Sequence, residues 1–184
     1  MNKADSPRTD QELLLGTVRR DEGDFAVLFD RYSAPLYNYL LRLVQQREVA
    51  EELLQEVFVA VWKGAGGFGG RSSVSTWLFR IAYHKAVGWL RRRQTESLEG
   101  LEHLPGDERP EEDAFDGWVA GRLAAALGQL SPDHRAVLEL TFVQGLSYRE
   151  VAQVVGCPVG TVKSRVSYAR RFLRGVLERM GIER

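Results

Sequence analysis

The chain has little of what several classes of protein depend on. Its single cysteine, Cys157, excludes an internal disulfide, and its three histidines, His84, His103 and His134, are too scattered to form a metal-ligand cluster. No stretch approaches the roughly 20 apolar residues that a membrane span needs, and the polar N-terminus has no apolar signal-peptide core. We therefore expect a cytoplasmic chain without a structural metal or a cofactor.

Charge of either sign is not in excess, and strand-like patterning is missing. The 184 residues include 25 Lys plus Arg and 25 Asp plus Glu, so the formal net charge is zero. The informative property is therefore where the charges lie along the chain. Apolar residues recur at helical spacing and nowhere alternate over a sustained run, which predicts an all-α fold.

The composition changes over residues 94–116, which are acidic, contain two prolines and include only Arg109 as a basic residue. Such a segment is typical of a flexible linker. We therefore expect two small helical domains joined by a flexible acidic linker. The expected parts are an N-terminal tail (1–9), a first domain (10–93), the linker (94–116) and a second domain (117–184).

Several helix boundaries follow from capping signals. Residues 9–12 and 147–150 have the pattern of a capping box, and Ser131, followed by a proline, is expected to start another helix. Asp24 is expected to open a helix in which Pro35 causes a kink or begins a new helix.

The second domain contains a helix-turn-helix pattern. Residues 147–155 make a capped helix, Gly156 provides the turn, and Pro158 stands at the first position of a second helix. Valines line one side of this second helix, and no acidic residue occurs between Val159 and Val176. In such motifs the start of the second helix reads base edges in the major groove, while basic side chains neutralise phosphates. The residues expected to face DNA are Gly160, Thr161, Lys163, Ser164, Arg165, Ser167, Arg170 and Arg171.

Other interpretations of this helix remain open. A basic helix face is often only solvated, although a solvated face usually mixes both signs. Tyr168 either packs over a sugar or phosphate or lies at the rim of the core. Cys157 is either a redox-sensitive thiol at a helix N-terminus or a small turn residue.

The first domain is expected to have two faces of opposite charge. The helix over residues 47–63 exposes Glu48, Glu51, Glu52, Gln55 and Glu56. This acidic face repels phosphates and suits a basic protein surface, unless it is an ordinary solvated face. The following segment, residues 71–93, is basic and aromatic without any acid, which is typical of proteins that bind unstacked, single-stranded nucleic acid.

A glycine-rich loop precedes this basic helix. The glycines predict a loop over residues 64–72, and Ser73 or Ser75 is expected to cap the helix that follows. Helical spacing places Lys85 near the apolar side of that helix. The residues expected to face DNA are Phe68, Arg71, Ser72, Ser73, Arg80, His84, Lys85, Arg91 and Arg92.

Three segments together resemble the extracytoplasmic-function (ECF) sigma factors, small specificity subunits of bacterial RNA polymerase. AEELLQEVFVAVWK resembles the region 2 helix that docks on the polymerase clamp, and STWLFRIAYHKAVGWLRRR resembles the helix that reads the minus-ten element. LSPDHRAVLELTFVQGLSYREVAQVVGCPVGTVKSRVSYARRFLR resembles region 4. The resemblance implies a protein that binds core RNA polymerase, recognises the minus-thirty-five and minus-ten promoter elements and captures melted DNA.

The resemblance also implies roles and partners. Glu52, Gln55 and Glu56 would contact a coiled coil of the largest polymerase subunit. The loop over residues 68–73 would hold a flipped minus-ten base, with His84 and Lys85 nearby. The residues that would lie on the minus-thirty-five element are Gly160, Thr161, Lys163, Ser164, Arg165, Ser167 and Arg170. An anti-sigma factor, often membrane-anchored in this family, is a further implied partner, and no small-molecule substrate is implied.

Three positions depart from the family's usual residues. Glu52 stands where the family usually has Asp, which is a mild change. His84 stands where Asn is frequent, which bears on the minus-ten preference. Tyr168 stands where Arg is common, which bears on one phosphate contact.

Two other classes of protein are alternatives. A stand-alone helix-turn-helix regulator would bind an operator as a dimer, without polymerase and at moderate salt. An enzyme such as a nuclease would need clustered carboxylates or a metal set in a pocket, whereas the acids here lie on an outer helix face or in the linker. The combination of an acidic face with two basic helices favours the sigma factor over both.

Overall fold

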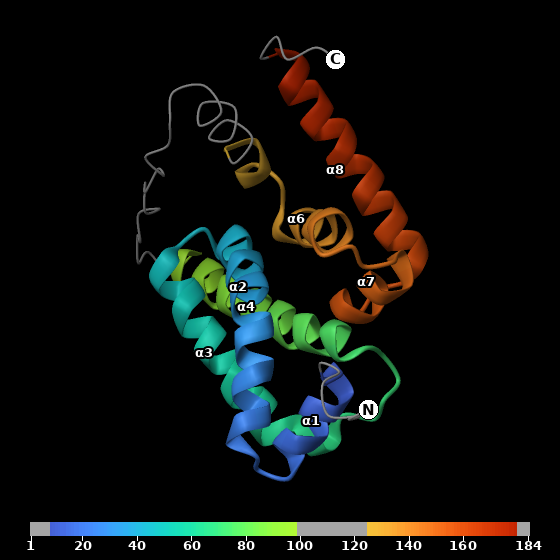
Figure 1. Cartoon of the computed structure of the whole chain (residues 1–184). Helices are drawn as coiled ribbons and strands as arrows, with labels where there is room; N and C mark the ends of the chain where they lie inside the picture. Colours follow the sequence, from blue (N-terminus) through green and yellow to red (C-terminus); the bar gives the residue numbers. More distant parts are fainter. Residues whose placement is uncertain (1–7, 99–124, 180–184) are drawn as a thin grey trace, which may run out of the picture.

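The computed structural model describes residues 8–98 and 125–179. Every regular element in these ranges is helical, which confirms the all-α prediction. The elements are α1 (Asp10–Val18), α2 (Glu22–Val44), α3 (Arg47–Gly64), the 3-10 turn η1 (Ala65–Gly67), α4 (Val74–Leu98), α6 (Pro132–Leu138), the π-helical turn η2 (Glu139–Val143), α7 (Tyr148–Val155) and α8 (Val159–Arg179) (Figure 1). Of the expected linker, residues 99–116 lie outside the described residues, as do residues 1–7, 117–124 and 180–184.

The predicted caps at Thr9, Ser73, Ser131 and Ser147 are confirmed. Thr9 and Ser147 each accept a hydrogen bond from the backbone N–H of the glutamate three residues later, whose carboxylate accepts one from the backbone of the cap residue. The side chain of Ser131 caps α6 by accepting a hydrogen bond from the backbone N–H of His134. Before α4, Oγ of Ser73 accepts from the backbone N–H of Thr76 at 3.1 Å. These side chains satisfy donors that a helix start leaves free and so fix where the helices begin.

Helix α2 begins earlier than expected, and at Pro35 it excludes one of the two expected alternatives, the start of a new helix. The side chain of Asp21 accepts from the backbone N–H of Asp24 at 3.0 Å, so the helix begins before Asp24. It then continues through Pro35 as one element, and no new helix begins there. Proline removes one intrahelical hydrogen bond. Leu36 and Leu40, in the next turns of α2, are fully buried, and their packing holds the helix together despite that loss.

The loop and the basic helix also have different limits from those expected. Helix α3 and the turn η1 extend to Gly67, so the irregular loop begins at Phe68. Gly70 in this loop has a φ of 66°, which favours glycine. Helix α4 continues through residues 94–98, which were expected in the linker.

Helices α1 to α4 form the first packed unit. The three long helices α2, α3 and α4 contact one another, and α1 packs on α2. Their shared core is built from fully buried leucines and valines, with the ring of Phe25 set edge-on against Phe58 and Trp62. This core fixes the outer faces of α3 and α4.

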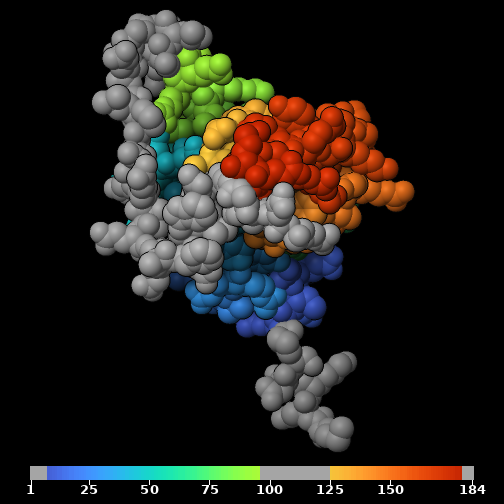
Figure 2. All heavy atoms as spheres, turned by 90° about the horizontal axis from the view of Figure 1, so that it is seen from above, coloured from blue at the N-terminus to red at the C-terminus, as the bar shows by residue number. Residues whose placement is uncertain are grey.

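Helices α6, α7 and α8 form a second unit, which packs against the first. Helix α6 lies against α2, and α7 lies against α4 in the most extensive contact between the units, whereas α8 packs on α6 and α7 (Figures 1 and 2). One continuous cluster of buried residues extends from Tyr39 and Phe79 in the first unit to Val137 and Val151 in the second. The sequence predicted two tethered domains but gave no sign of this contact. None of the described helices has both the length and the apolarity needed to cross a bilayer.

Candidate nucleic-acid and protein interfaces

Helices α7 and α8 form the predicted helix-turn-helix. Helix α7 ends at Gly156, whose φ of 68° places it in the left-handed region and whose N–H bonds to the carbonyl of Ala152 at 2.9 Å. Val162 and Val166 are buried on the inner side of α8. Their spacing of four residues turns the other side of α8 outward.

The outer face of α8 carries most of the residues expected to face DNA. Gly160, Lys163, Ser164, Ser167, Arg170 and Arg171 are exposed, and Thr161 is half-buried. Tyr168 is 51% exposed, and its ring lies 4.6 Å from that of His134. The guanidinium of Arg170 lies over the exposed ring of Phe142 at 5.9 Å.

Arg165 is the exception on this face. Its Nη2 atom lies 2.6 Å from Oδ2 of Asp133 on α6, and its side chain is only 25% exposed. The other carboxylate oxygen of Asp133 accepts a hydrogen bond from the hydroxyl of Tyr83 on α4 at 3.0 Å. Burial, reinforced by Asp133, raises the pKa of Tyr83 to about 12. Asp133 thus joins the two basic helices, a role that sequence reasoning missed because local patterns do not pair residues so far apart in the chain.

The acidic face of α3 is present as predicted. Glu48, Glu51, Glu52, Gln55 and Glu56 are all exposed. Beside them runs an open groove of about 550 Å³, lined by Glu52, Gln55, Glu56, Val59, Ala60, Lys63 and Lys85. Val59, which is 50% exposed, and Ala60 form the apolar part of its lining. Sequence reasoning missed this apolar part, since an isolated exposed valine leaves no distinctive pattern.

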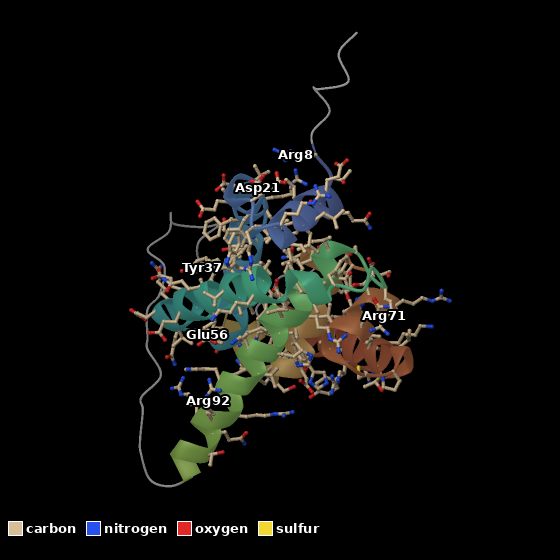
Figure 3. The ribbon with its side chains drawn as sticks, turned by 90° about the horizontal axis from the view of Figure 1, so that it is seen from below. Arg8, Asp21, Tyr37, Glu56, Arg71 and Arg92 are labelled. Carbon is tan, nitrogen blue, oxygen red and sulfur yellow. The ribbon has the colours of Figure 1, made fainter. Side chains whose placement is uncertain are left out.

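Lys85 lies with the acidic face rather than with the other basic residues of α4. Its Nζ atom is 2.7 Å from Oε2 of Glu56, across the groove between α3 and α4. Figure 3 shows Glu56 beside α4, with Arg92 farther along the same helix. The structure therefore brings together two residues that were expected on different interfaces.

The remaining minus-ten candidates are mostly exposed along α4 and the loop before it. Arg71, Ser73, Arg80, His84, Arg91 and Arg92 are exposed, and Ser72 is half-buried. Partial burial, followed by the charges of Arg80 and Arg91, lowers the pKa of His84 below its ordinary value of 6.5. The imidazole is therefore neutral near pH 7, and His84 adds no positive charge to this face.

Phe68 lies beside a pocket at the loop. Its half-buried ring packs on that of Trp77, with 5.4 Å between centroids. The pocket has a volume of about 430 Å³ and is lined by Gln11, Leu14, Leu15, Val18, Ala65, Gly66, Phe68, Gly69 and Gly70. An apolar pocket of this size with an aromatic edge can accept a planar group such as a base.

Sequence comparison matches both units to known families. The family described as "Sigma-70 region 2" matches residues 28–96, and "Sigma-70, region 4" matches residues 120–173. The ECF RNA polymerase sigma factor RpoE of Cereibacter sphaeroides is 35% identical over 92% of this chain and 96% of its own length. SigX of Bacillus subtilis, also an ECF sigma factor, is 34% identical over 85% of each chain.

Solved structures agree with this assignment. The sigma factor RpoE of Bartonella quintana, in complex with the anti-sigma factor NepR, matches with a TM-score of 0.73 and 27% identity, over 84% of this chain and 97% of that one. CnrH, in complex with the cytosolic domain of CnrY, matches with a TM-score of 0.70 and 26% identity, over 92% and 97% of the two chains. Both units thus match sigma factors in sequence and in fold, and they occur in the same order along the chain. The chain belongs to the ECF family of RNA polymerase sigma factors.

Proposed function

We propose that this ECF sigma factor binds core RNA polymerase through the acidic face of α3 and promoter DNA through α8 and α4. The observation that carries the proposal is the separation of charge between helices. Five exposed acidic or amide residues lie on α3, whereas the exposed polar face of α8 is basic up to Val176. A cationic protein surface and a nucleic acid thus have separate places to bind.

The second unit supports recognition of the minus-thirty-five element. Small side chains at Gly160, Ser164 and Ser167 allow close approach to base edges, and Lys163 and Arg171 are placed to meet phosphates. Each good bidentate base contact contributes about 1–3 kcal/mol of discrimination. A few such contacts give useful specificity only when both units act together on one enzyme.

The first unit supports capture of the minus-ten element. The pocket beside Phe68 fits a flipped base, and Arg80, Arg91 and Arg92 supply cations along α4 for the opened strand. Stacking of one base on an aromatic ring contributes about 1–3 kcal/mol. The free energy of these contacts offsets the cost of opening the duplex, so the chain acts by binding and makes or breaks no covalent bond.

The similar solved structure of RpoE from Bartonella quintana is a complex of a sigma factor with an anti-sigma factor. It supports an anti-sigma factor as a further partner of this chain. We expect this partner to cover the polymerase-binding surface. The proposed place of action is the cytoplasm, where core polymerase and promoter DNA meet.

Run-off transcription with sigma-free core polymerase and a promoter library tests the function. The unaltered chain is expected to give defined start sites. Glu52→Lys should lose binding to core polymerase, whereas Lys163→Glu should retain it and lose start-site selection. Start sites that are unchanged in both variants, or tight operator binding by the free chain with no transcription, would contradict the proposal and favour a stand-alone regulator.

A further inference from the structure

A histidine on α6 and a tyrosine on α8 lie side by side at the edge of the proposed DNA surface. The ring centroids of His134 and Tyr168 are 4.6 Å apart, with an angle of 39° between the ring planes. Tyr168 is 51% exposed and His134 is half-buried, so part of each ring is open to solvent. The pair therefore presents an imidazole and a phenol at one place on the surface of the second unit.

The pair lies beside the row of α8 side chains that is proposed to face DNA. Thr161, Ser164 and Tyr168 follow one another at spacings of three and four residues, which places them on one side of the helix. The nearest cation on α8 is Arg165, whose guanidinium is paired with the carboxylate of Asp133 at 2.6 Å. A DNA phosphate beside Tyr168 therefore needs a hydrogen-bond donor other than a free arginine.

Ser131 determines which nitrogen of His134 is available as that donor. Its Oγ atom lies 2.6 Å from Nδ1 of the imidazole and also accepts from the backbone N–H of His134. The hydroxyl proton is then directed at Nδ1, so the neutral imidazole carries its own proton on Nε2. In the imidazolium, Nδ1–H donates to Oγ instead. In both charge states Nε2–H remains a donor, and none of the described residues accepts from it.

Two opposite charges face the imidazole. Partial burial, followed by the charge of Arg165 on α8, lowers the pKa of His134 below its ordinary value of 6.5, whereas Asp133 on α6 opposes this shift. Among the described residues of α2, α7 and η2, which also contact α6, none contributes a charge to it. The imidazole of the free chain is therefore neutral near pH 7. A phosphate placed at Nε2 would favour the charged form.

We propose that His134 and Tyr168 form a phosphate-binding site beside the minus-thirty-five surface, in which Nε2 of His134 and the hydroxyl of Tyr168 donate to the DNA backbone. This inference deepens the proposed function and rests on the DNA-binding role of α8. Contacts of this kind fix the position of the duplex on the protein and carry no base specificity. His134 takes up a proton from solvent as DNA binds, so the site strengthens binding as the pH falls.

The test uses holoenzyme reconstituted from core polymerase and the full chain. It is titrated with a duplex that carries the selected minus-thirty-five sequence and ends before the minus-ten element. His134→Gln is the main variant, because a glutamine amide keeps an N–H donor and gains no charge. Tyr168→Phe keeps the ring and removes the hydroxyl. His103→Gln is the matched control, since it makes the same exchange at a histidine that belongs to neither proposed DNA surface.

Affinity is measured at about pH 7.5 and about pH 6, on either side of the ordinary histidine pKa, and over a range of salt concentrations. His134→Gln should bind like the parent at the higher pH and at least about threefold more weakly at the lower pH. The slope of log affinity against log salt concentration should be steeper by up to about 0.9 at the lower pH in the parent, but not in His134→Gln. Tyr168→Phe should bind about three- to tenfold more weakly at both pH values. His103→Gln should follow the parent.

A parent-to-His134→Gln affinity ratio that is equal at the two pH values would overturn the site, as would unchanged binding by Tyr168→Phe. If His134 served only to support the fold, His134→Gln would lower the unfolding temperature and leave the pH dependence of binding as in the parent. Failure of the proposed function is distinguishable, because the parent holoenzyme would then bind the minus-thirty-five duplex no better than a scrambled one. Failure of the phosphate site alone would leave that preference intact.

Discussion

The ammonium of Lys85 lies 2.7 Å from the carboxylate of Glu56, which places a cation of the basic helix on the polymerase side of the molecule. Because Glu56 already engages this charge, Lys85 should contribute little to binding of the opened DNA strand. Arg80, exposed on the same helix, should contribute a full phosphate contact.

The salt dependence of DNA affinity should distinguish Arg80 from Lys85. For single-stranded nucleic acid, each phosphate contact contributes about 0.7 to the slope of log affinity against log salt concentration. Arg80→Gln should therefore lower the slope for a single-stranded minus-ten oligonucleotide on holoenzyme by about 0.7. Lys85→Gln should leave the slope nearly unchanged. An equal decrease of this slope in the two variants would show that Lys85 also contacts the DNA.

The comparison of Lys85 with its neighbours shows what sequence could and could not predict. Caps at Thr9 and Ser147 and the turn at Gly156 were predictable, since each depends on residues within a few positions of one another. The exposed faces of α3 and α8 followed from helical spacing. The partner of Lys85, and the hold of Asp133 on Arg165, depend on how separate helices pack, which local periodicity does not encode.

The two glycines of the helix-turn-helix should respond in opposite ways. Gly156 has a φ of 68° and open space where a Cβ would stand, so Gly156→Ala should cost about 1–2 kcal/mol of stability through backbone strain alone. Gly160 lies within α8 and also has open space, so Gly160→Ala should raise stability by up to about 1 kcal/mol. Duplex affinity should nevertheless fall in Gly160→Ala, because the added methyl stands between α8 and the bases. Thermal unfolding and duplex titration of both variants check this, and a destabilised Gly160→Ala would contradict it.

The cap of α7 should make the stability of the second unit decrease at acidic pH. Hydrogen bonds from Ser147, first from its side chain and then from its backbone, lower the pKa of Glu150 below 4.5. The folded chain thus favours the carboxylate. This contribution is present above pH 4.5 and is lost as the pH falls through the folded pKa.

Ser147→Ala should cost about 1 kcal/mol near neutral pH, the usual effect of losing a cap. The difference in unfolding free energy between parent and Ser147→Ala should shrink as the pH falls below 4.5. Urea titrations at about pH 7 and about pH 4, on either side of the ordinary glutamate pKa, measure it. A difference that stays constant across this range would mean that the hydrogen bonds of Glu150 contribute nothing to the cap.

The lowered pKa of His84 predicts a pH dependence of minus-ten binding. Burial, then Arg80 and Arg91, disfavours the imidazolium, so the side chain is neutral above pH 6.5 and gains charge only as the pH falls below that value. Protonation beside DNA adds a cation, and affinity for the single-stranded minus-ten oligonucleotide should rise as the pH falls from about 7.5 to about 6. His84→Asn should show a flat profile over the same range. Equal profiles in the two chains would place His84 away from the strand.

The apolar part of the groove beside α3, formed by Val59 and Ala60, should be as important for polymerase binding as its acidic side chains. Val59 is 50% exposed, so Val59→Lys exchanges little buried surface and should leave thermal stability within about 0.5 kcal/mol. A lysine there would oppose the cationic surface that Glu52 and Glu56 are proposed to bind, and would put a charge into the apolar part of the contact. Affinity for core polymerase should fall at least about tenfold, which corresponds to about 1.4 kcal/mol. Val27→Lys is the matched control, because Val27 is 41% exposed on α2 and does not line the groove. If both variants bound core polymerase like the parent, the polymerase contact would be confined to the acidic side chains, and the groove would have no part in it.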